Sequence, residues 1–117
     1  MCYGERMITV VAYQDSEGRE PFTRWFADLD AMSAAKVHAA LIRLAAGNVS
    51  EVKPVGSGVS ERRIHWGPGY RVYFGQDGKM LVLLLAGGTK ASQARDIPIA
   101  KSRWVDYRQR KRAGGSQ

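Results

Sequence analysis

The chain has very little of what disulfide, metal and membrane proteins need. Its 117 residues include a single cysteine, Cys2, which excludes an internal disulfide and any cysteine-based zinc site. It has only two histidines, and no cluster of histidine, aspartate and glutamate has the spacing of a metal site. The longest apolar run, Met80 to Ala86, has the length of a strand and is too short to cross a membrane. We therefore expect no metal or other cofactor and no membrane span.

The first residues also lack the apolar stretch of a secretory signal, which favours a cytoplasmic protein. Hydrophobic residues make up 44% of the chain, enough for one core at this length. Neither an internal repeat nor a domain linker is visible. We expect a single domain over residues 1–112 and a disordered tail over residues 113–117.

Positive charge is concentrated in the second half of the chain. Residues 1–50 contain five Lys/Arg and six Asp/Glu, for a net charge of −1, whereas residues 51–117 contain thirteen and five, for +8. Such an asymmetry is typical of a protein that binds a polyanion or an acidic partner. A merely basic, well-solvated surface is the alternative that charge alone leaves open.

The first half predicts one strand and two helices. Apolar and β-branched residues over Met7–Tyr13 favour a strand. Pro21 suits a first helical position, and the apolar residues after it have helical spacing. Asp30 or Ser33 can cap a second helix, which ends near Gly47. We expect these helices to pack together as a hairpin.

The second half predicts a loop, three strands and a helix. Residues 49–60 read as a loop, and the run Met80–Leu85, apolar on both faces, as a central strand covered on both sides. The last helix either starts at a cap on Asp96, which we favour, or starts at Ser92 and bends near Pro98, because proline costs about 3 kcal/mol inside a helix. The order β-α-α-β-β-β-α predicts an α+β fold, with a mostly antiparallel sheet of about four strands, the helical hairpin on one face, and the last helix at an edge or end.

The segment Arg62–Phe74 (RRIHWGPGYRVYF) is the most informative part of the chain. Two strand-like runs meet at a Gly-Pro-Gly turn. Folding about Pro68 places four polar residues on one face in two opposed pairs, His65 with Arg71 and Arg63 with Tyr73. The other face receives Ile64, Trp66, Tyr70 and Val72. This hairpin therefore predicts an exposed polar flank that suits the binding or cleavage of a phosphodiester.

Other side chains have simpler interpretations. We expect the remaining large aromatic residues to lie in the core with the hairpin tryptophan: Trp25, Phe26, Trp66 and Trp104. His38, on the second helix, is expected at the surface. An arginine opposite a tyrosine is also an ordinary cross-strand cation–π pair. For His65, catalysis is the leading interpretation, and phosphate binding and a plain surface position are the alternatives.

The chain resembles the RelE/ParE toxin superfamily, more narrowly the addiction-module killer proteins related to HigB toxins. The resemblance extends from Met7 to Arg108. It rests on the strand and helical hairpin, the run GVSERRIHWGPGYRVYF over residues 58–74, an apolar strand ending in Gly-Gly-Thr-Lys, and the final Trp/Tyr helix. It implies a RelE-like fold and a toxin that cleaves mRNA in the ribosomal A site, with a basic groove and no metal. It also implies a cognate antitoxin, expected to be a helix-turn-helix DNA-binding protein.

The resemblance suggests roles for single residues. Arg63 and His65 fall near the paired lysines of RelE, Arg71 matches the arginine of its Gly-Tyr-Arg, and Lys90 matches the basic residue after its last strand. The C-terminal tyrosine of RelE has no clear counterpart, since Asp96 falls near that place. Metal-free cleavage needs proton transfer, which imidazole performs well, and positive charge on the phosphate, which arginine supplies. The candidate catalytic residues are His65, Arg71, Arg63 and Lys90, and the candidate RNA-binding residues are Lys53, Arg62, Tyr73, Lys101 and Arg108.

The leading interpretation is the toxin of a type II toxin–antitoxin pair, a ribosome-dependent mRNA endoribonuclease that inhibits translation. The alternative is a ParE-like inhibitor of DNA gyrase without catalysis of its own. A third possibility is a protein of the same fold that binds RNA without turnover. The histidine-bearing basic hairpin favours the first.

Overall fold

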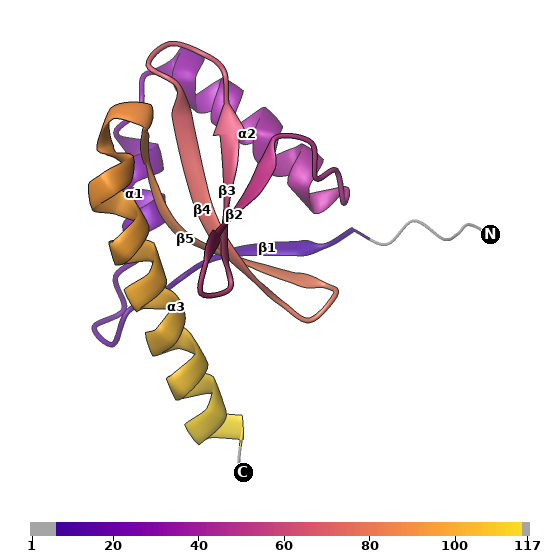
Figure 1. Cartoon of the computed structure of the whole chain (residues 1–117), viewed down its shortest axis with the longest axis vertical. Helices are drawn as coiled ribbons and strands as arrows, with labels where there is room; N and C mark the ends of the chain where they lie inside the picture. Colours follow the sequence, from indigo (N-terminus) through magenta and orange to yellow (C-terminus); the bar gives the residue numbers. More distant parts are fainter. Residues whose placement is uncertain (1–6, 116–117) are drawn as a thin grey trace, which may run out of the picture.

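The computed structural model, which describes residues 7–115, is an α+β fold with one mixed sheet between two helical layers (Figure 1). The strands are β1 (Thr9–Ala12), β2 (Val52–Gly56), β3 (Val59–Ile64), β4 (Tyr70–Asp77) and β5 (Leu81–Thr89). The helices are α1 (Pro21–Ala27), α2 (Ala31–Ala45) and α3 (Gln93–Gly115), and a short 3-10 helix η1 (Lys90–Ser92) leads into α3. None of these helices is both long and apolar enough to span a membrane.

The sheet has five strands in the order β1-β5-β4-β3-β2. β1 runs parallel to β5, and the other neighbours are antiparallel. The sequence-based expectation of about four strands was wrong because the segment over residues 49–60, interpreted as a loop, contains β2. Gly56, Ser57 and Gly58 all have positive φ and form a tight turn between β2 and β3. Pro54 is compatible with β2 because this strand lies at the edge of the sheet.

Two hydrophobic clusters cover the two faces of the sheet. On the first face, α1 and α2 pack with Phe22, Val37 and Leu44 against Val72 and Val82. On the second face, α3 packs with Ala100 and Trp104 against Tyr73, Leu83 and Leu85. Strand β5 is therefore central and covered on both sides, as its sequence predicted. Helix α3 was expected at an edge or end of the sheet; it covers a face instead, because every second residue of β5 presents apolar area to it.

Two glycines in β5 let groups from opposite layers approach the strand. A Cβ at Gly87 would lie 2.2 Å from the ring of Trp25 on α1. A Cβ at Gly88 would lie 1.9 Å from the carboxylate of Asp96 on α3. Both glycines lie inside β5, which continues to Thr89, so the pair does not end the strand. Their missing side chains allow both helical layers to contact the same short stretch of strand.

The ends of the long helices follow local rules. Asp30 caps α2, since its carboxylate accepts a hydrogen bond from the Ser33 amide at 3.1 Å, and Gly47 follows the helix with a φ of 86°. Helix α3 starts at Gln93, earlier than the favoured cap on Asp96. Asp96 is unavailable as a cap because it accepts a hydrogen bond from the Ser92 hydroxyl. Pro98 therefore lies inside the helix.

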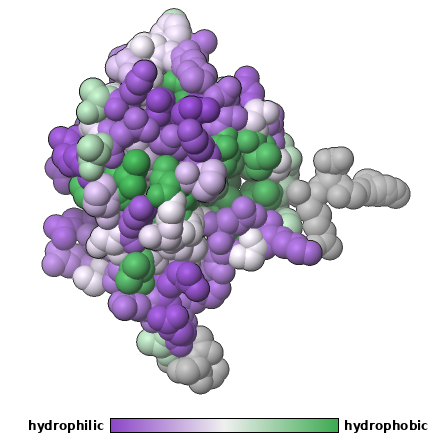
Figure 2. All heavy atoms as spheres, in the orientation of Figure 1, coloured by the Kyte–Doolittle hydropathy of each residue, from purple (hydrophilic) through white to green (hydrophobic). Residues whose placement is uncertain are grey.

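The helical end of the chain extends further than the sequence indicated. Residues 113–115 belong to α3, while residues 116–117 of the expected tail, like Cys2, lie outside the described residues. The far half of α3 projects beyond the sheet (Figure 1). Figure 2 shows hydrophilic side chains over most of this face of the molecule, with a band of hydrophobic ones across its middle.

Candidate functional site

The β3–β4 hairpin forms as predicted, but its register differs by two residues from the expected one. Arg63 pairs with Arg71, and Glu61 with Tyr73, whereas His65 lies beyond the end of β3. The strand ends early because the Trp66 amide donates a hydrogen bond back to the Ile64 carbonyl at 3.0 Å. The chain then turns through Gly67 and Pro68, since the Gly69 amide bonds to the Trp66 carbonyl. The expected pairs of His65 with Arg71 and Arg63 with Tyr73 are therefore wrong.

The two faces of the hairpin are nevertheless largely those expected, because a slip of two residues keeps every side chain on its own face. Ile64, Tyr70 and Val72 belong to the core beneath α1 and α2. Trp66 was expected with them but is 37% exposed, with the Lys36 ammonium 4.8 Å from its ring centre. The core prediction fails for this tryptophan because it lies past the end of the strand. His38 is exposed on α2, as expected.

The middle of the polar face is buried under the start of α3. Arg71 and Tyr73 are 6% and 0% exposed, so the predicted open flank does not extend to them. The Arg71 Nε lies 3.9 Å from the Glu61 carboxylate. This carboxylate also accepts a hydrogen bond from the side-chain amide (Nε2) of Gln93 at 2.8 Å. Burial, and then the charges of Glu61 and Asp96, raise the pKa of Tyr73 to about 12. Tyr73 is therefore a neutral, inaccessible phenol near neutral pH.

Lys90 lies close to Arg71, at the turn of the hairpin. The Lys90 amide donates a hydrogen bond to the Gly69 carbonyl at 2.7 Å, which holds the start of η1 against the hairpin turn. A Cβ at Gly69 would lie 3.5 Å from Lys90 and 3.7 Å from an Arg71 guanidinium nitrogen. The Lys90 side chain is exposed, whereas the Arg71 guanidinium is enclosed. Only the lysine of this pair is open to a ligand in this conformation.

His65 and Arg63 of the hairpin both contact Glu51, at the edge of the sheet. The His65 Nε2 lies 2.8 Å from the Glu51 carboxylate, where its N–H donates a hydrogen bond, and an Arg63 guanidinium nitrogen lies 3.6 Å from the same oxygen. The Arg63 amide also donates to the Glu51 carbonyl at 2.9 Å. His65 and Arg63 thus share a partner. Arg71 contacts a different carboxylate, that of Glu61. Arg63 links the contacts around Glu51 to those around Glu61, because it is the cross-strand partner of Arg71.

A groove of about 260 Å³ opens next to Glu51, between α2 and the end of β3. We call it the α2–β3 groove. Its lining includes four apolar residues, Ala39, Ala40, Ile64 and Trp66. The others are five basic or histidine residues and one glutamate: Lys36, Arg43, Arg62, Arg63, His65 and Glu51. Arg62 is 6% exposed, and burial followed by the charge of Arg43 lowers the pKa of its guanidinium. The groove therefore carries an excess of positive charge, part of it buried.

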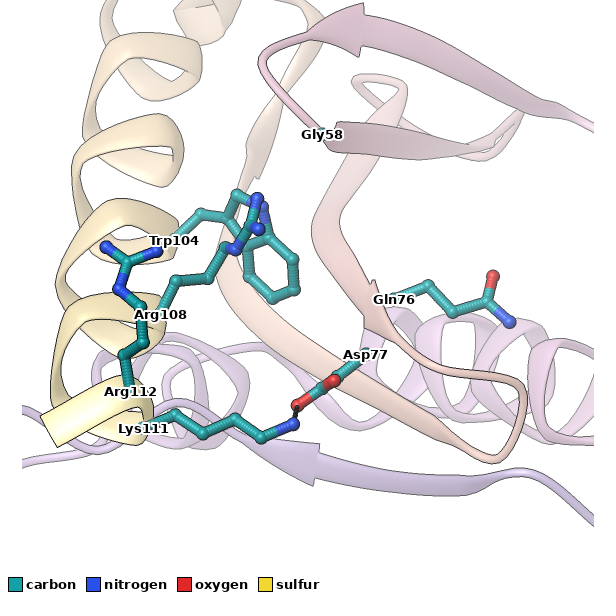
Figure 3. A pocket seen from close by; sticks show the side chains of 7 residues that line it. All are labelled: Gly58, Gln76, Asp77, Trp104, Arg108, Lys111 and Arg112. Atoms are coloured by element: carbon teal, nitrogen blue, oxygen red, sulfur yellow. Dashed lines mark hydrogen bonds and ion pairs between the residues drawn. The ribbon is translucent and has the colours of Figure 1, made fainter. Parts of the chain in front are cut away.

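The other predicted RNA-binding residues are distributed along the opposite face. Lys53 is exposed on β2, and the Lys101 ammonium lies against Gly56 at the β2–β3 turn. The Arg108 guanidinium lies 5.9 Å from the Trp104 ring centre, in a second cavity of about 660 Å³ (Figure 3). Figure 3 shows Arg108 pointing over Trp104, while Lys111 reaches across to Asp77. These cations are not part of the α2–β3 groove.

Sequence reasoning missed three residues of the groove: Lys36, Arg43 and Glu51. The two basic residues come from α2. Their spacing of seven residues places both on one side of the helix, next to the buried Val37 and Ala40. Glu51 has a φ of 63°, a conformation unusual for glutamate that no sequence pattern announces. The sequence shows that these residues are basic, but only the tertiary fold shows that α2 and β3 face each other across the groove.

The site contains groups for phosphate binding and for proton transfer. Guanidinium groups bind phosphate oxygens through paired hydrogen bonds, and an exposed imidazole can accept or donate a proton. Within residues 7–115, no group of three or more histidine, cysteine, aspartate or glutamate side chains is arranged to hold a metal ion.

Comparison with known proteins relates the chain to a bacterial protein. No family model matches the chain. An uncharacterized protein from Haemophilus influenzae is 43% identical over 81 residues, which are 68% of this chain and 82% of the relative. Identity at this level over most of the relative implies a shared fold. The chain therefore belongs to the same family as this Haemophilus influenzae protein.

Proposed function

We propose that the protein is the toxin of a type II toxin–antitoxin pair and acts as a metal-independent, ribosome-dependent mRNA endoribonuclease. The observation that carries this proposal is the cluster of Arg62, Arg63 and His65 at the end of β3, beside a groove whose lining has five basic or histidine residues and one carboxylate. Such a positively charged surface binds a phosphate-bearing polymer more tightly than a neutral or acidic protein surface would. The resemblance of the hairpin to RelE-like toxins supplies the reaction class.

In the proposed reaction, the 2′-hydroxyl of a nucleotide gives up its proton to a base and its oxygen bonds to the adjacent phosphorus. The bond from this phosphorus to the 5′-oxygen breaks, and the leaving 5′-oxygen takes up a proton. His65 is the group that moves a proton, since its imidazole is 65% exposed and reachable. Arg63 binds the phosphate as negative charge develops on it. Lys90 and the buried Arg71 contribute positive potential from the neighbouring turn.

A ParE-like gyrase inhibitor is the second candidate, and one observation favours it. His65 and Arg71, two of the four candidate catalytic residues, contact different carboxylates, and Arg71 is enclosed. A basic surface without an assembled catalytic pair is also sufficient for an inhibitor that only binds. In an enzyme, the hairpin end has to rearrange on the ribosome to bring these groups onto one phosphate.

Two assays with the purified protein separate these candidates. In the first, the protein is added to translating ribosomes with a defined mRNA, and the new 5′ ends are mapped. In the second, it is added to DNA gyrase with supercoiled plasmid. Breaks at defined positions of the reading frame support the endoribonuclease. Trapped gyrase–DNA breaks with intact mRNA support the inhibitor and would reject the proposed reaction.

The proposal also includes a partner, a cognate antitoxin with a helix-turn-helix DNA-binding domain. An acidic or amphipathic segment of such a partner would cover the basic surface or displace α3. Co-expression with the product of the adjacent gene tests this: a neutralising partner restores growth and co-purifies, whereas a neighbour that does neither contradicts it.

A further inference from the structure

We propose that Glu51 occupies a phosphate-binding site in the α2–β3 groove of the free protein, and that an RNA phosphate displaces its carboxylate on binding. The RNA part of this inference rests on the proposed function. It adds Lys36 and Arg43 to the binding surface and gives Glu51 the role of a competitor, which neither the sequence pattern nor the proposed reaction assigns.

The first argument is the position of the Glu51 carboxylate. It accepts a hydrogen bond from His65 at 2.8 Å and lies 3.6 Å from the Arg63 guanidinium. These are the two exposed groups to which the proposed reaction gives direct contact with the substrate. A carboxylate and a phosphodiester carry the same single charge and offer similar acceptor oxygens. Glu51 therefore stands where the scissile phosphate has to bind.

The second argument is a buried guanidinium to which no carboxylate of the described residues is hydrogen-bonded. Arg62 is only 6% exposed, and its Nε makes no hydrogen bond to any residue of the described chain. A terminal nitrogen of Arg62 donates a hydrogen bond to the Arg63 carbonyl. Burial and then repulsion by Arg43 disfavour the charge on Arg62, and the charge of Glu51 opposes them only in part. An anion entering the groove would offset this cost.

The third argument is that Glu51 is free to leave. Its side chain is 42% exposed, and it lies in the connection between α2 and β2 rather than inside an element. Its φ of 63° lies in a sparsely populated region for a residue other than glycine. Contact with His65, and then with the neighbouring arginines, lowers the pKa of Glu51, so the carboxylate is charged at neutral pH and competes with phosphate.

The proposal predicts a gain of binding when the competitor is removed. In Glu51→Gln, inorganic phosphate and a short single-stranded RNA should bind about tenfold more tightly than in the wild type, because a like charge next to the ligand is lost. Glu17→Gln makes the same change of net charge at an exposed ion pair with Arg19 and should change affinity less than about twofold. Arg43→Gln, at an exposed position of α2, should weaken phosphate binding several-fold.

The measurements are a phosphate titration followed by NMR on the His65 ring and fluorescence anisotropy with labelled RNA, both at one fixed salt concentration. A poly-glutamate peptide forms the third arm. If Glu51→Gln binds phosphate and RNA no tighter than the wild type does, or more weakly, the proposal is wrong. Tighter binding of the peptide alone would assign the groove to an acidic protein and also overturn it.

The failure of this inference is distinguishable from failure of the proposed function. Normal mRNA cleavage with an unchanged affinity in Glu51→Gln would leave the function standing and remove Glu51 from the site. Tighter phosphate and RNA binding without any cleavage on ribosomes would keep the anion site and reject the reaction. Thermal unfolding of each variant shows whether the fold is retained, and Arg43→Gln tests the groove independently of Glu51.

Discussion

At the residue scale, the complete burial of Tyr73 gives this side chain a structural role rather than a substrate-binding one. Its hydroxyl makes no hydrogen bond within the described residues, and its side chain has no exposed area. A base cannot stack on it unless α3 moves away from the sheet. The original expectation that Tyr73 binds RNA came from its alternation with Arg71, which correctly gave the face but could not reveal that the start of α3 covers it.

Tyr73→Phe should leave stability at neutral pH within about 1 kcal/mol of wild type, since the removed hydroxyl has no partner to lose. Burial raises the pKa of Tyr73 from 10.0 to about 12, so its contribution to stability is complete below pH 10 and is lost as the pH rises through about 12. Chemical unfolding between pH 9 and 12 measures this. The variant should lose less stability than the wild type across the window; an equal loss, or a loss of RNA cleavage at neutral pH, would contradict the assignment.

Asp106 provides a contact that should weaken in acid. Its carboxylate accepts hydrogen bonds from the Tyr13 hydroxyl at 2.6 Å and from Arg110 at 2.7 Å, joining the end of β1 to α3. The Tyr13 hydrogen bond, followed by that of Arg110, lowers the pKa of Asp106. A depressed folded pKa means that the stabilisation is present above the ordinary carboxyl pKa and is lost as the pH falls through the folded value.

Asp106→Asn should therefore reduce stability at pH 7 and flatten the loss of stability on acidification below about pH 4. Urea unfolding at a series of pH values gives both quantities. Asp28→Asn, at an exposed residue after α1, is the matched control and should behave as wild type. Parallel pH profiles for Asp106→Asn and wild type would show that the contact contributes nothing.

At the scale of elements, Trp104 joins α3 to strand β4 and to the β2–β3 turn through glycines. A Cβ at Gly75 on β4 would lie 2.3 Å from its ring, and one at Gly58 would lie 2.7 Å from its indole nitrogen. The ring also stacks on Tyr107, with centroids 5.6 Å apart. The docking of α3 on the sheet therefore depends on missing side chains as much as on apolar ones.

Gly75→Ala should destabilise the protein by about 1–3 kcal/mol, because the tryptophan has to move from a close-packed position. Gly114→Ala, where a Cβ meets nothing within 4 Å near the end of α3, is the control and should be neutral or slightly stabilising. Thermal unfolding compares the two. A Gly75→Ala protein as stable as the wild type would show that Trp104 is loosely packed.

The sequence predicted most elements because their signals are local. The end of α2 at Gly47 and the two-sided apolar pattern of β5 each depend on neighbouring residues, and both were confirmed. Of the two caps that the sequence left open for α2, Asp30 and Ser33, the structure has Asp30. The register of the β3–β4 hairpin was wrong because it depends on where β3 ends, and Trp66 turns back by a backbone hydrogen bond that any residue can make. Strand β2 was missed because Pro54 and Gly56, with Gly58 in the following turn, give this segment the composition of a loop.

At the scale of the whole molecule, the positive charge expected from the second half of the chain separates into two surfaces. One is the α2–β3 groove, and the other follows α3 around Arg108 and Arg112. Composition revealed the excess charge, but α2 comes from the half with a net negative charge, so its contribution through Lys36 and Arg43 required the fold. Of these two surfaces, only the groove includes His65.

The α3 surface should add affinity for RNA without affecting the chemistry. Replacing both Arg108 and Arg112 with glutamine should weaken single-stranded RNA binding at low salt and reduce the slope of log affinity against log salt by about 1.4, or about 0.7 for each lost phosphate contact. Anisotropy titrations at several salt concentrations measure the slope. An unchanged slope would show that α3 does not contact the RNA.

The central claim is that His65, at the end of the hairpin, takes part in cutting mRNA on the ribosome. The chain contains a matched control, since its other histidine, His38, is exposed on α2. On translating ribosomes with a defined mRNA, His65→Ala should cleave at least about 100-fold more slowly than the wild type, which is the loss expected for a proton-transfer group. His38→Ala should cleave at the wild-type rate. Equal cleavage by His65→Ala and wild type, at equal protein stability, would contradict the claim.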